Sequence, residues 1–172
     1  MQITAEDAVH ADLHDSLIEC WMAVSNAGGA AGFPFPPVDV SDVAPVADAL
    51  IRDLDPKRSR LIVALDDGVL AGWVNLHRDL NPVVSHWGTV RHLQTHPQFR
   101  RRGIGVALMR RLHAVARVEM GLSQLHLAAR AGMGLEEFYG QLGWREIGRW
   151  HGALRLADGD DRDEVLMILD PL

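Results

Sequence analysis

Arginine and glycine residues gather in the stretch "FRRRGIG", residues 99–105, and their types are suited to holding an anion. Guanidinium groups bond phosphate oxygens in pairs, and glycine lets a phosphate approach the backbone closely. An apolar helical pattern begins inside the stretch, and the first N–H groups of a helix lie unpaired at the positive end of its dipole. We therefore expect a phosphate-binding turn; the alternative is a tight turn beside a solvated basic patch.

Two well-known phosphate loops do not fit this turn. A Walker loop needs a lysine and then a serine or threonine after its second glycine, and the turn has neither. A dinucleotide-binding fingerprint has a third glycine, where this chain has Leu108, and it follows the first strand of a parallel sheet. This turn lies past the middle of the chain, so both patterns fail on position as well as on residue type.

The elements around the turn follow from the apolar periodicity. We predict a strand at residues 89–95 before the turn and a helix at 103–120 after it, because apolar residues recur there at helical spacing. Next we predict a strand at 123–129, a short helix at 135–142 ended by Gly143, and strands at 144–150 and 164–169. The acidic run at 158–164 is expected to be a solvated hairpin loop, or else a surface that attracts a cationic amine.

Helices and a hairpin are predicted before the turn. Ile3 opens a short strand, and Thr4 is expected to cap a helix that starts near Glu6 and ends by Gly28. Its inner face would carry Leu13, Leu17, Cys20 and Val24. "GFPFPP" at 32–37 is either a surface connection or a pocket wall, and a second helix is expected at 41–54. The Asp-Asp-Gly turn at 66–68 between apolar runs predicts a hairpin.

Composition limits the classes of function. The chain has 172 residues with 48% hydrophobic content, which suits a single domain at 1–172. A net charge of -6 argues against a nucleic-acid-binding protein. The acidic N-terminal stretch and the lack of long apolar runs lead us to expect a cytoplasmic protein without a membrane segment.

Cysteine and histidine residues give little support for a metal. Cys20 is the only cysteine, so neither a disulfide within the chain nor a four-cysteine metal site can form. His10 and His14 have a spacing that can ligate zinc, but a third ligand is not evident nearby. We expect a solvated helix face there, and no bound metal.

Three motifs in order resemble the GNAT superfamily of acyl-coenzyme A N-acyltransferases. Residues 100–105 match its Arg/Gln-x-x-Gly-x-Gly/Ala motif, "VRHLQTHPQF" before them resembles its signature strand, and "EEFYGQLGW" at 136–144 resembles its tyrosine-bearing segment. The order of predicted elements agrees with the family from about residue 60 to 169. Within the family the chain looks most like the tabtoxin-resistance type.

The resemblance implies a fold and an activity. The expected fold class is α/β (α+β), with a mixed, mostly antiparallel central sheet flanked by helices and strands parted around the coenzyme A site. The implied function is an acetyl-CoA-dependent N-acetyltransferase that modifies the amine of a small molecule by direct transfer in a ternary complex. A non-catalytic acyl-coenzyme A sensor of the same fold is the alternative. Dimerisation is common in the family.

The resemblance also implies roles for single residues. Main-chain groups of residues 101–106 and the arginine side chains would hold the pyrophosphate, residues 93–95 would pair with the pantetheine arm, and a main-chain donor near Leu93 would hold the thioester carbonyl. Tyr139, the only tyrosine, would be the general acid. Gly132 stands where the family often has an asparagine. The implied cofactor-binding residues are Leu93, Gln94, Thr95, Arg100, Arg101, Arg102, Gly103, Ile104, Gly105, Val106, Gly132 and Tyr139.

A general base is not evident in the sequence. The tabtoxin-resistance type carries acidic residues where this chain has Thr89 and Ala128. His92, His126 or a water molecule remain as candidates. Strand alternation would put His92 on the same face as Val90 and Gln94. The acceptor amine is not identified; the aromatic residues that could line its pocket, or belong to the core, are Trp21, Phe33, Phe35, Trp73 and Trp87.

Overall fold

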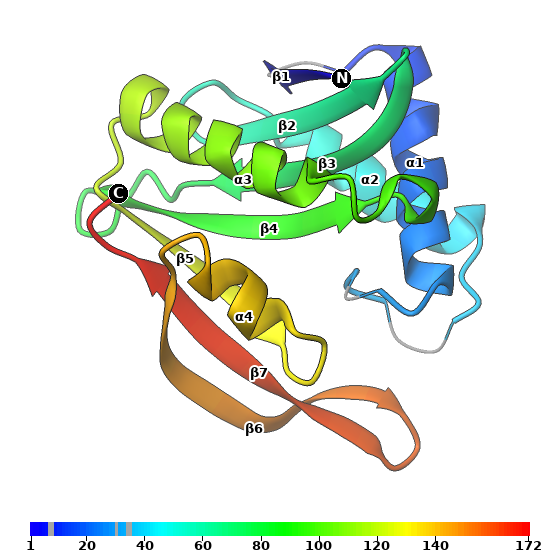
Figure 1. The fold of residues 1–172 in the computed structure, drawn as a ribbon. Helices are drawn as coiled ribbons and strands as arrows, with labels where there is room; N and C mark the ends of the chain where they lie inside the picture. The colour runs from blue at the N-terminus through cyan, green and yellow to red at the C-terminus, as the bar shows by residue number, and fades with distance from the viewer. Residues whose placement is uncertain (7–8, 30, 34–35) are drawn as a thin grey trace.

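A mixed seven-stranded sheet with helices on both faces forms the body of the protein in the computed structural model, which describes residues 1–6, 9–29, 31–33 and 36–172 (Figure 1). The elements are β1 (Gln2–Glu6), α1 (Ala11–Asn26), α2 (Val40–Arg52), β2 (Ser59–Asp66), β3 (Val69–His77), β4 (Trp87–Thr95), the 3-10 turn η1 (Pro97–Phe99), α3 (Ile104–Ala114), the π-helical turn η2 (Val115–Glu119), β5 (Gln124–Arg130), α4 (Leu135–Gly140), β6 (Arg145–Ala157) and β7 (Asp160–Leu169). The strand order is β1-β2-β3-β4-β5-β7-β6, and only β4 and β5 pair in parallel. The expected mostly antiparallel sheet is confirmed.

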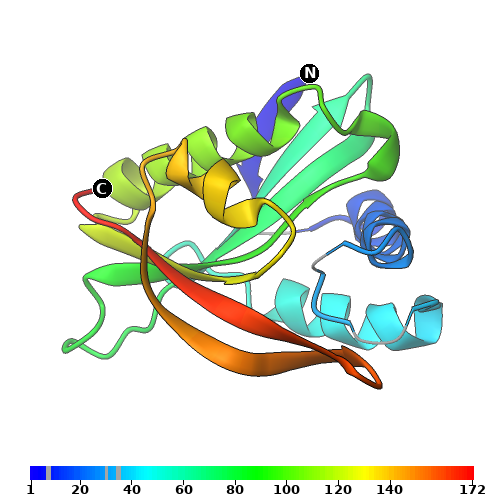
Figure 2. The ribbon, with the colours of Figure 1, turned by 60° about the horizontal axis from the view of Figure 1, so that its bottom comes forward.

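Two hydrophobic clusters hold the helices on the sheet. α3 and α4 cover one face and α1 and α2 the other (Figure 2). Side chains of β2 contribute to both clusters in alternation. Leu61 and Val63 belong to the cluster under α1 and α2, while Ile62 and Ala64 belong to the cluster under α3. A strand covered on both faces is apolar at every position, which explains the unbroken run in β2.

The N-terminal elements differ from the prediction. Thr4 does not cap a helix, because it lies in β1 and is paired with Val63 of β2. The helix starts at Ala11, and its N-cap is His10, whose side chain makes no capping bond. The predicted inner face of α1 is buried at Leu17, Cys20 and Val24. Backbone pairing with β2 satisfies the N–H and C=O groups of this edge strand, and a helix at the same residues would leave that edge of β2 unpaired.

The predicted helix at 41–54 and the predicted hairpin are both found. α2 begins one residue earlier than predicted and ends at Arg52. A capping box stabilises its N-terminus, because Asp39 and Asp42 each accept a hydrogen bond from the other's backbone N–H group. β2 and β3 are joined at Asp67 and Gly68, which both have positive φ angles, of 49° and 82°. This is the backbone conformation that tight hairpins favour and that Asp-Gly sequences adopt.

The C-terminal hairpin is longer than predicted. β6 continues to Ala157 and β7 starts at Asp160, so most of the acidic run is strand and only Asp158 and Gly159 form the turn. Arginines on the two strands bind the carboxylates: Arg155 bonds Asp161 at 2.7 and 2.8 Å, and Arg162 pairs with Asp160. These pairs offset the charge repulsion that made a loop the simpler prediction.

The predicted long helix at 103–120 contains a wider turn. α3 is regular to Ala114 and then continues as the π-helical η2 to Glu119, with Met120 N donating to Val115 O at 3.0 Å. Gly121 follows with a φ of 65°, as expected of a glycine that ends a helix. Among the residues described, no helix has the length and apolar character needed to span a membrane.

Candidate functional site

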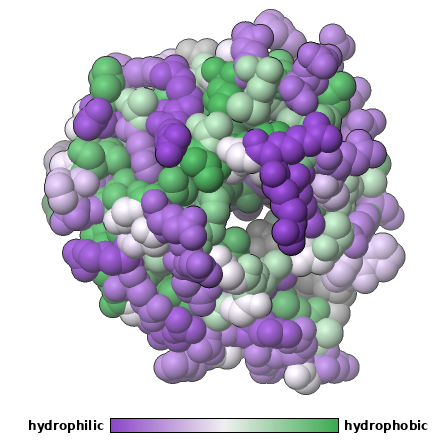
Figure 3. Space-filling view, viewed as in Figure 1, coloured by the Kyte–Doolittle hydropathy of each residue, from purple (hydrophilic) through white to green (hydrophobic). Residues whose placement is uncertain are grey.

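A cavity of about 990 Å³ opens where β4 and β5 separate. The two strands pair only from Trp87 to Thr89, and beyond Thr89 they diverge. The cavity is lined by both strands, the glycine turn, the start of α3, α4, the segment after α1 and the C-terminal hairpin. Seen from the side of Figure 1, the surface is hollowed near its centre, with strongly hydrophilic side chains beside the opening (Figure 3).

The arginine-glycine turn forms one end of the cavity. Gly103 is the N-cap of α3 with a φ of 76°, and Arg101 also has a positive φ, of 60°. A Cβ on Gly105 would lie 3.4 Å from Phe138 Cζ, in ordinary van der Waals contact with that ring. Left-handed backbone at two positions turns the chain sharply into the helix. The residues that carry the first N–H groups of α3, at 103–106, line the cavity.

Most of the residues predicted for the cofactor line this cavity. They are Leu93, Gln94, Thr95, Arg100, Arg101, Gly103, Ile104, Gly105, Val106 and Tyr139. Gly132 instead lines an adjoining pocket of about 360 Å³.

The Arg102 side chain does not line the cavity and turns away from it. It is 59% exposed, lies 3.7 Å from a carboxylate oxygen of Asp66 and covers the ring of Phe99. The prediction that the Arg102 side chain takes part in the anion site therefore has no support in the geometry.

A β-bulge shapes the wall of the cavity in β4. Trp73 pairs with Gln94 and Asn75 pairs with Arg91, so two residues, His92 and Leu93, lie opposite one. His92 has a φ of 57°. Because β5 has already diverged, the main-chain groups of these two residues lie outside the register of both neighbouring strands. Such groups are free to bond a ligand.

The bulge also corrects the predicted alternation. Val90 belongs to the cluster under α3, whereas the His92 ring stacks on Trp21 and Trp73, at centroid distances of 4.8 and 5.9 Å, on the face of α1. The extra residue shifts the alternation, so Val90 and His92 do not share a face.

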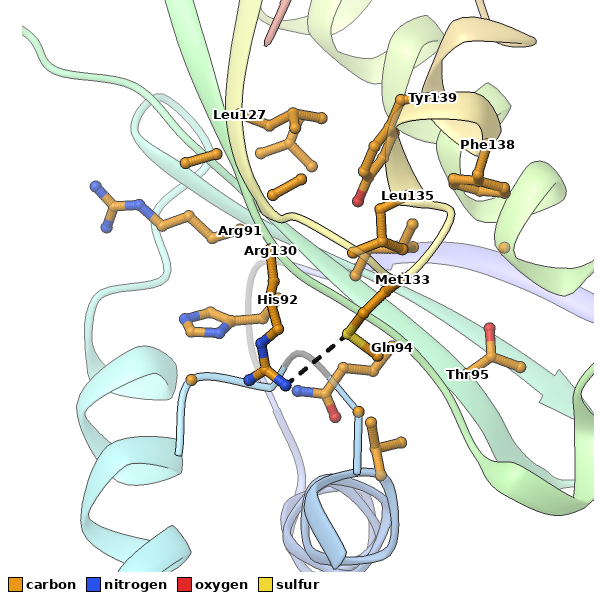
Figure 4. A pocket seen from close by; sticks show the side chains of 18 of the residues that line it. Arg91, His92, Gln94, Thr95, Leu127, Arg130, Met133, Leu135, Phe138 and Tyr139 are labelled. Atoms are coloured by element: carbon orange, nitrogen blue, oxygen red, sulfur yellow. Dashed lines mark hydrogen bonds between the residues drawn. The ribbon is translucent and has the colours of Figure 1, made fainter. Parts of the chain in front are cut away.

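Tyr139 enters the cavity from α4 (Figure 4). Its side chain is buried, with the ring against Phe138 and Trp144 at centroid distances of 5.0 and 6.0 Å. Figure 4 shows its hydroxyl directed toward the space between β4 and β5. Desolvation raises the pKa of Tyr139 to about 12, so the hydroxyl keeps its proton at neutral pH. This is the state that a proton donor requires.

The two histidine candidates for a base differ in position. His92 lines the cavity, but burial, assisted by the charge of Arg91, lowers its pKa to about 4. His126 lies outside the cavity lining, bonds Gln124 at 2.8 Å and stacks on Trp87 at 4.5 Å; burial also lowers its pKa. His126 therefore has a structural environment, and His92 is a weak base.

Side chains of Glu164, Arg130 and Gln94, none of which was predicted as an acceptor-site residue by itself, also line the cavity. Glu164 of β7 is the only carboxylate among the described lining residues, and Arg130 of β5 lies directly opposite it in the strand register. The buried Gln94 side chain adds an amide whose Nε2 and Oε1 have no hydrogen-bond partner in the described part of the chain. The sequence contains only a weak indication that Arg130 and Glu164 lie opposite each other, since their pairing depends on the register of β5 and β7.

The aromatic residues divide between wall and core. Phe33 lines the cavity, together with Gly32, so this part of "GFPFPP" forms a wall. Trp21 and Trp73 are fully buried behind His92 and belong to the core. Phe35 lies outside the described residues.

The histidines of α1 show no metal-binding arrangement. His14 bonds Asp15 and Asp48 of α2, both at 2.8 Å. No three histidine, cysteine or acidic side chains cluster to hold a metal ion within residues 1–6, 9–29, 31–33 and 36–172. His14 thus links α1 to α2, a role that the prediction of a solvated face did not include.

Comparisons with known proteins agree with this geometry. The sequence model of the Acetyltransferase (GNAT) family matches residues 11–144. The chain belongs to the GNAT acetyltransferase family. Curated relatives include the mycothiol acetyltransferases of Mycolicibacterium vanbaalenii, 44% identical over 68 residues, and of Mycolicibacterium smegmatis, 40% identical over 68 residues. Each match covers 40% of this chain and only about a fifth of the relative, at 21% and 22%. The tabtoxin-resistance type stays a prediction from the sequence.

Solved structures of acetyltransferases share the fold over nearly the whole chain. A ribosomal-protein-alanine N-acetyltransferase from Brucella melitensis has a TM-score of 0.78 at 18% identity, with all of both chains covered. A putative acetyltransferase from Salmonella typhimurium, solved with its cofactor acetyl-CoA, has a TM-score of 0.75 at 16% identity and covers 99% of this chain and 94% of that one. At such identities the likeness concerns the fold alone.

The cavity of this GNAT chain suits the cofactor that the family uses. A Cβ on Gly103 would meet nothing within 4 Å, so the helix start is open to a phosphate group. Arg100 and Arg101 line the same end of the cavity, and the unpaired backbone of His92 and Leu93 lies along β4. An anionic group at one end and an extended arm along a strand therefore find matching partners.

Proposed function

We propose that this protein is an acetyl-CoA-dependent N-acetyltransferase that acetylates a small-molecule amine by direct transfer in a ternary complex. The observation that carries the proposal is one continuous cavity, which joins the start of α3, where we expect an anion to bind, to the buried side chain of Tyr139. A route that joins these two features suits a long, anionic acyl carrier that enters between β4 and β5.

The residues would divide the binding as follows. Main-chain N–H groups at 103–106 bond the pyrophosphate, since glycine at 103 and 105 leaves them uncovered. The Arg100 and Arg101 side chains add positive charge at the same end. Main-chain groups of residues 93–95 pair with the pantetheine arm as an added strand would. The Gly132 contact is weakened by its position in the adjoining pocket.

Acetyl transfer needs a held carbonyl and a proton for the leaving thiolate. Acetyl-CoA supplies the acetyl group as a thioester. The main-chain N–H of Leu93, freed by the bulge, is the donor that we assign to the carbonyl oxygen. Tyr139 Oη donates the proton to the thiolate, because its raised pKa keeps that proton in place until the charge develops.

The acceptor amine must also lose its proton. We assign this step to Glu164, directly or through a water molecule, because its carboxylate is the only one among the described residues that line the cavity. His92 is a poorer candidate, because its pKa of about 4 leaves the ring neutral at neutral pH, and a neutral ring does not attract an ammonium group as a carboxylate does. A carboxylate on β7 would replace those that the family resemblance led us to expect at Thr89 and Ala128.

The acceptor is proposed to be a small molecule. The resemblance to the tabtoxin-resistance type and the partial likeness to mycothiol acetyltransferases both favour a small acceptor over a protein. The remaining question is whether the cavity carries out chemistry or only binds an acyl-coenzyme A as a sensor.

A thiol-release assay with acetyl-CoA and a broad panel of amines tests the proposal. Release that depends on the amine and falls in Tyr139→Phe supports an enzyme. Binding of acetyl-CoA without turnover across the panel would favour the sensor instead. Gly105→Glu serves as the control for binding, because it should remove both the cofactor-induced rise in melting temperature and the turnover.

A further inference from the structure

The side chain of Arg130 faces the cavity without an acidic partner. Its Nε has no hydrogen-bond partner in the described part of the chain, and its Nη1 contacts only the sulfur of Met133, at 3.9 Å. A thioether is a weak acceptor, so most of the five guanidinium donors of Arg130 lack a strong partner. Burial lowers the pKa of Arg130, against the effect of Asp160, which itself pairs with Arg162.

Arg130 and the expected phosphate-binding turn lie on opposite faces of the sheet. Leu125, Leu127 and Ala129 of β5 belong to the cluster under α3. Side chains alternate along a strand, so Arg130 points to the opposite face, toward α1. The glycine turn and the start of α3 lie on the first face. Arg130 is therefore not placed to bond the pyrophosphate, and it stands where an acceptor would enter.

The side chain of Gln94 provides a second unsatisfied group on this face. Gln94 is paired in register with Trp73, which belongs to the cluster under α1. It is only 2% exposed, and both of its side-chain amide atoms lack partners in the described part of the chain. Figure 4 shows Gln94 and Arg130 entering the cavity from β4 and β5, while Arg91 points away from both. Buried amides without partners are costly, so a ligand is expected to satisfy this one.

We propose, on the basis of the proposed acetyl transfer, that Arg130 and the Gln94 side chain bind a carboxylate carried by the acceptor amine. A guanidinium fork matches a carboxylate with two parallel bonds. Glu164 lies across the strand pair from Arg130 without forming an ion pair with it, so a ligand bound beside these two residues meets a negative group and a positive group that do not neutralise each other. The acceptor class that fits both charges is an amino acid or a similar zwitterion.

Paired substrates test this assignment. Each amino acid in a panel is compared with its own carboxamide in the thiol-release assay, with phosphoethanolamine included as an amine that carries a phosphate. The wild-type protein should prefer the carboxylate, and Arg130→Met should lower kcat/KM for it about ten- to hundredfold with little change for the carboxamide. Gln94→Leu should weaken the same preference to a smaller degree.

Arg155 is the matched control. It lines the same cavity, but Asp161 already holds its guanidinium through two bonds, so Arg155→Met should keep the preference for the carboxylate. Equal rates for acid and amide, a preference that survives Arg130→Met, or a preference for phosphoethanolamine would each overturn the assignment.

A second readout separates this assignment from the proposed activity. The melting temperature is measured with coenzyme A and with N-acetyl amino acids or their carboxamides, which requires no turnover. Stabilisation by the acids alone, lost in Arg130→Met and kept in Arg155→Met, supports the carboxylate site even if no amine is acetylated. If amines are acetylated but neither readout distinguishes acid from amide, the proposed function stands and the carboxylate site is wrong.

Discussion

Gly105 of α3 and Phe138 of α4 face each other so closely that a Cβ on Gly105 would lie 3.4 Å from the Phe138 ring. The start of α3 therefore lies against the helix that carries Tyr139. The glycine motif and the tyrosine motif are thus one structural unit. A change at either residue should affect the anion site and the position of the tyrosine together.

Gly105→Glu should abolish binding of coenzyme A. The added side chain would fill the cavity beside Phe138, and its negative charge would repel the pyrophosphate at the start of α3. Isothermal titration with coenzyme A measures the effect. Gly105→Ala is the matched control, and it should retain binding with a modest loss because its Cβ fits with only a small shift. Undiminished affinity in Gly105→Glu would contradict the proposed site.

Arg101→Ala and Arg102→Ala should differ in their effect on cofactor affinity. Arg101 lines the cavity, whereas the Arg102 side chain lies on Asp66 and Phe99. We expect Arg101→Ala to weaken binding about threefold to tenfold, as loss of an exposed charge-assisted contact does, and Arg102→Ala to weaken it less. The same titration, repeated at higher salt, should reduce the difference. A larger loss in Arg102→Ala would overturn this reading of the turn.

Local signals in the sequence were sufficient for much of this region. The glycine turn, the helix after it and the Asp-Gly hairpin follow from backbone preferences and apolar spacing over a few residues. The bulge at His92 was not predictable in this way, because an extra residue in β4 has no counterpart in the alternation pattern.

That Arg130 and Glu164 lie opposite each other in the strand register could also not be predicted from the sequence. Strand register depends on which side chains pack between distant strands, and the acidic run before Glu164 has the composition of a loop. Arginines bound to that run extend β6 and β7 beyond the predicted strands, and Glu164, at the first position of the predicted strand, lines the cavity. With Thr89 and Ala128 in place of the acidic residues of the tabtoxin-resistance type, the sequence left His92, His126 or water as candidates for the base.

Tyr139→Phe should lower kcat about a hundredfold or more while affinity for acetyl-CoA changes little, since only the hydroxyl is lost. The pKa of Tyr139 is raised to about 12, and a donor works only while protonated. Its contribution is therefore complete at neutral pH and is lost only as the pH rises toward 12. A kcat profile between pH 7 and 10 should show no decline due to this residue. A decline centred near pH 9 would rule out Tyr139 in its buried state as the donor.

His14 should make stability depend on pH at the contact between α1 and α2. Hydrogen bonds to Asp15 and then Asp48 raise its pKa, so the folded state holds the proton more tightly than the unfolded chain. The stabilisation is complete below the ordinary pKa of about 6.5 and is lost as the pH rises through the raised folded value. His14→Ala should therefore lower the melting temperature more at pH 5.5 than at pH 9. Because the side chain is 33% exposed, the effect should be about 1 kcal/mol or less.

Glu164→Gln should lower kcat/KM for the acceptor amine at least about tenfold, because the amide can neither attract the ammonium nor take its proton. His92→Gln should have a smaller effect, since the lowered pKa of His92 leaves its ring neutral and unable to attract the ammonium by charge. Initial rates across a pH series separate the two roles of Glu164. If it removes the proton, Glu164→Gln should recover activity as the pH rises and the amine loses its proton to solvent.

Glu146→Gln is the matched control, because that carboxylate is bound by Arg149 outside the cavity lining. A loss in His92→Gln that exceeds the loss in Glu164→Gln would move the base from β7 back to the bulge in β4.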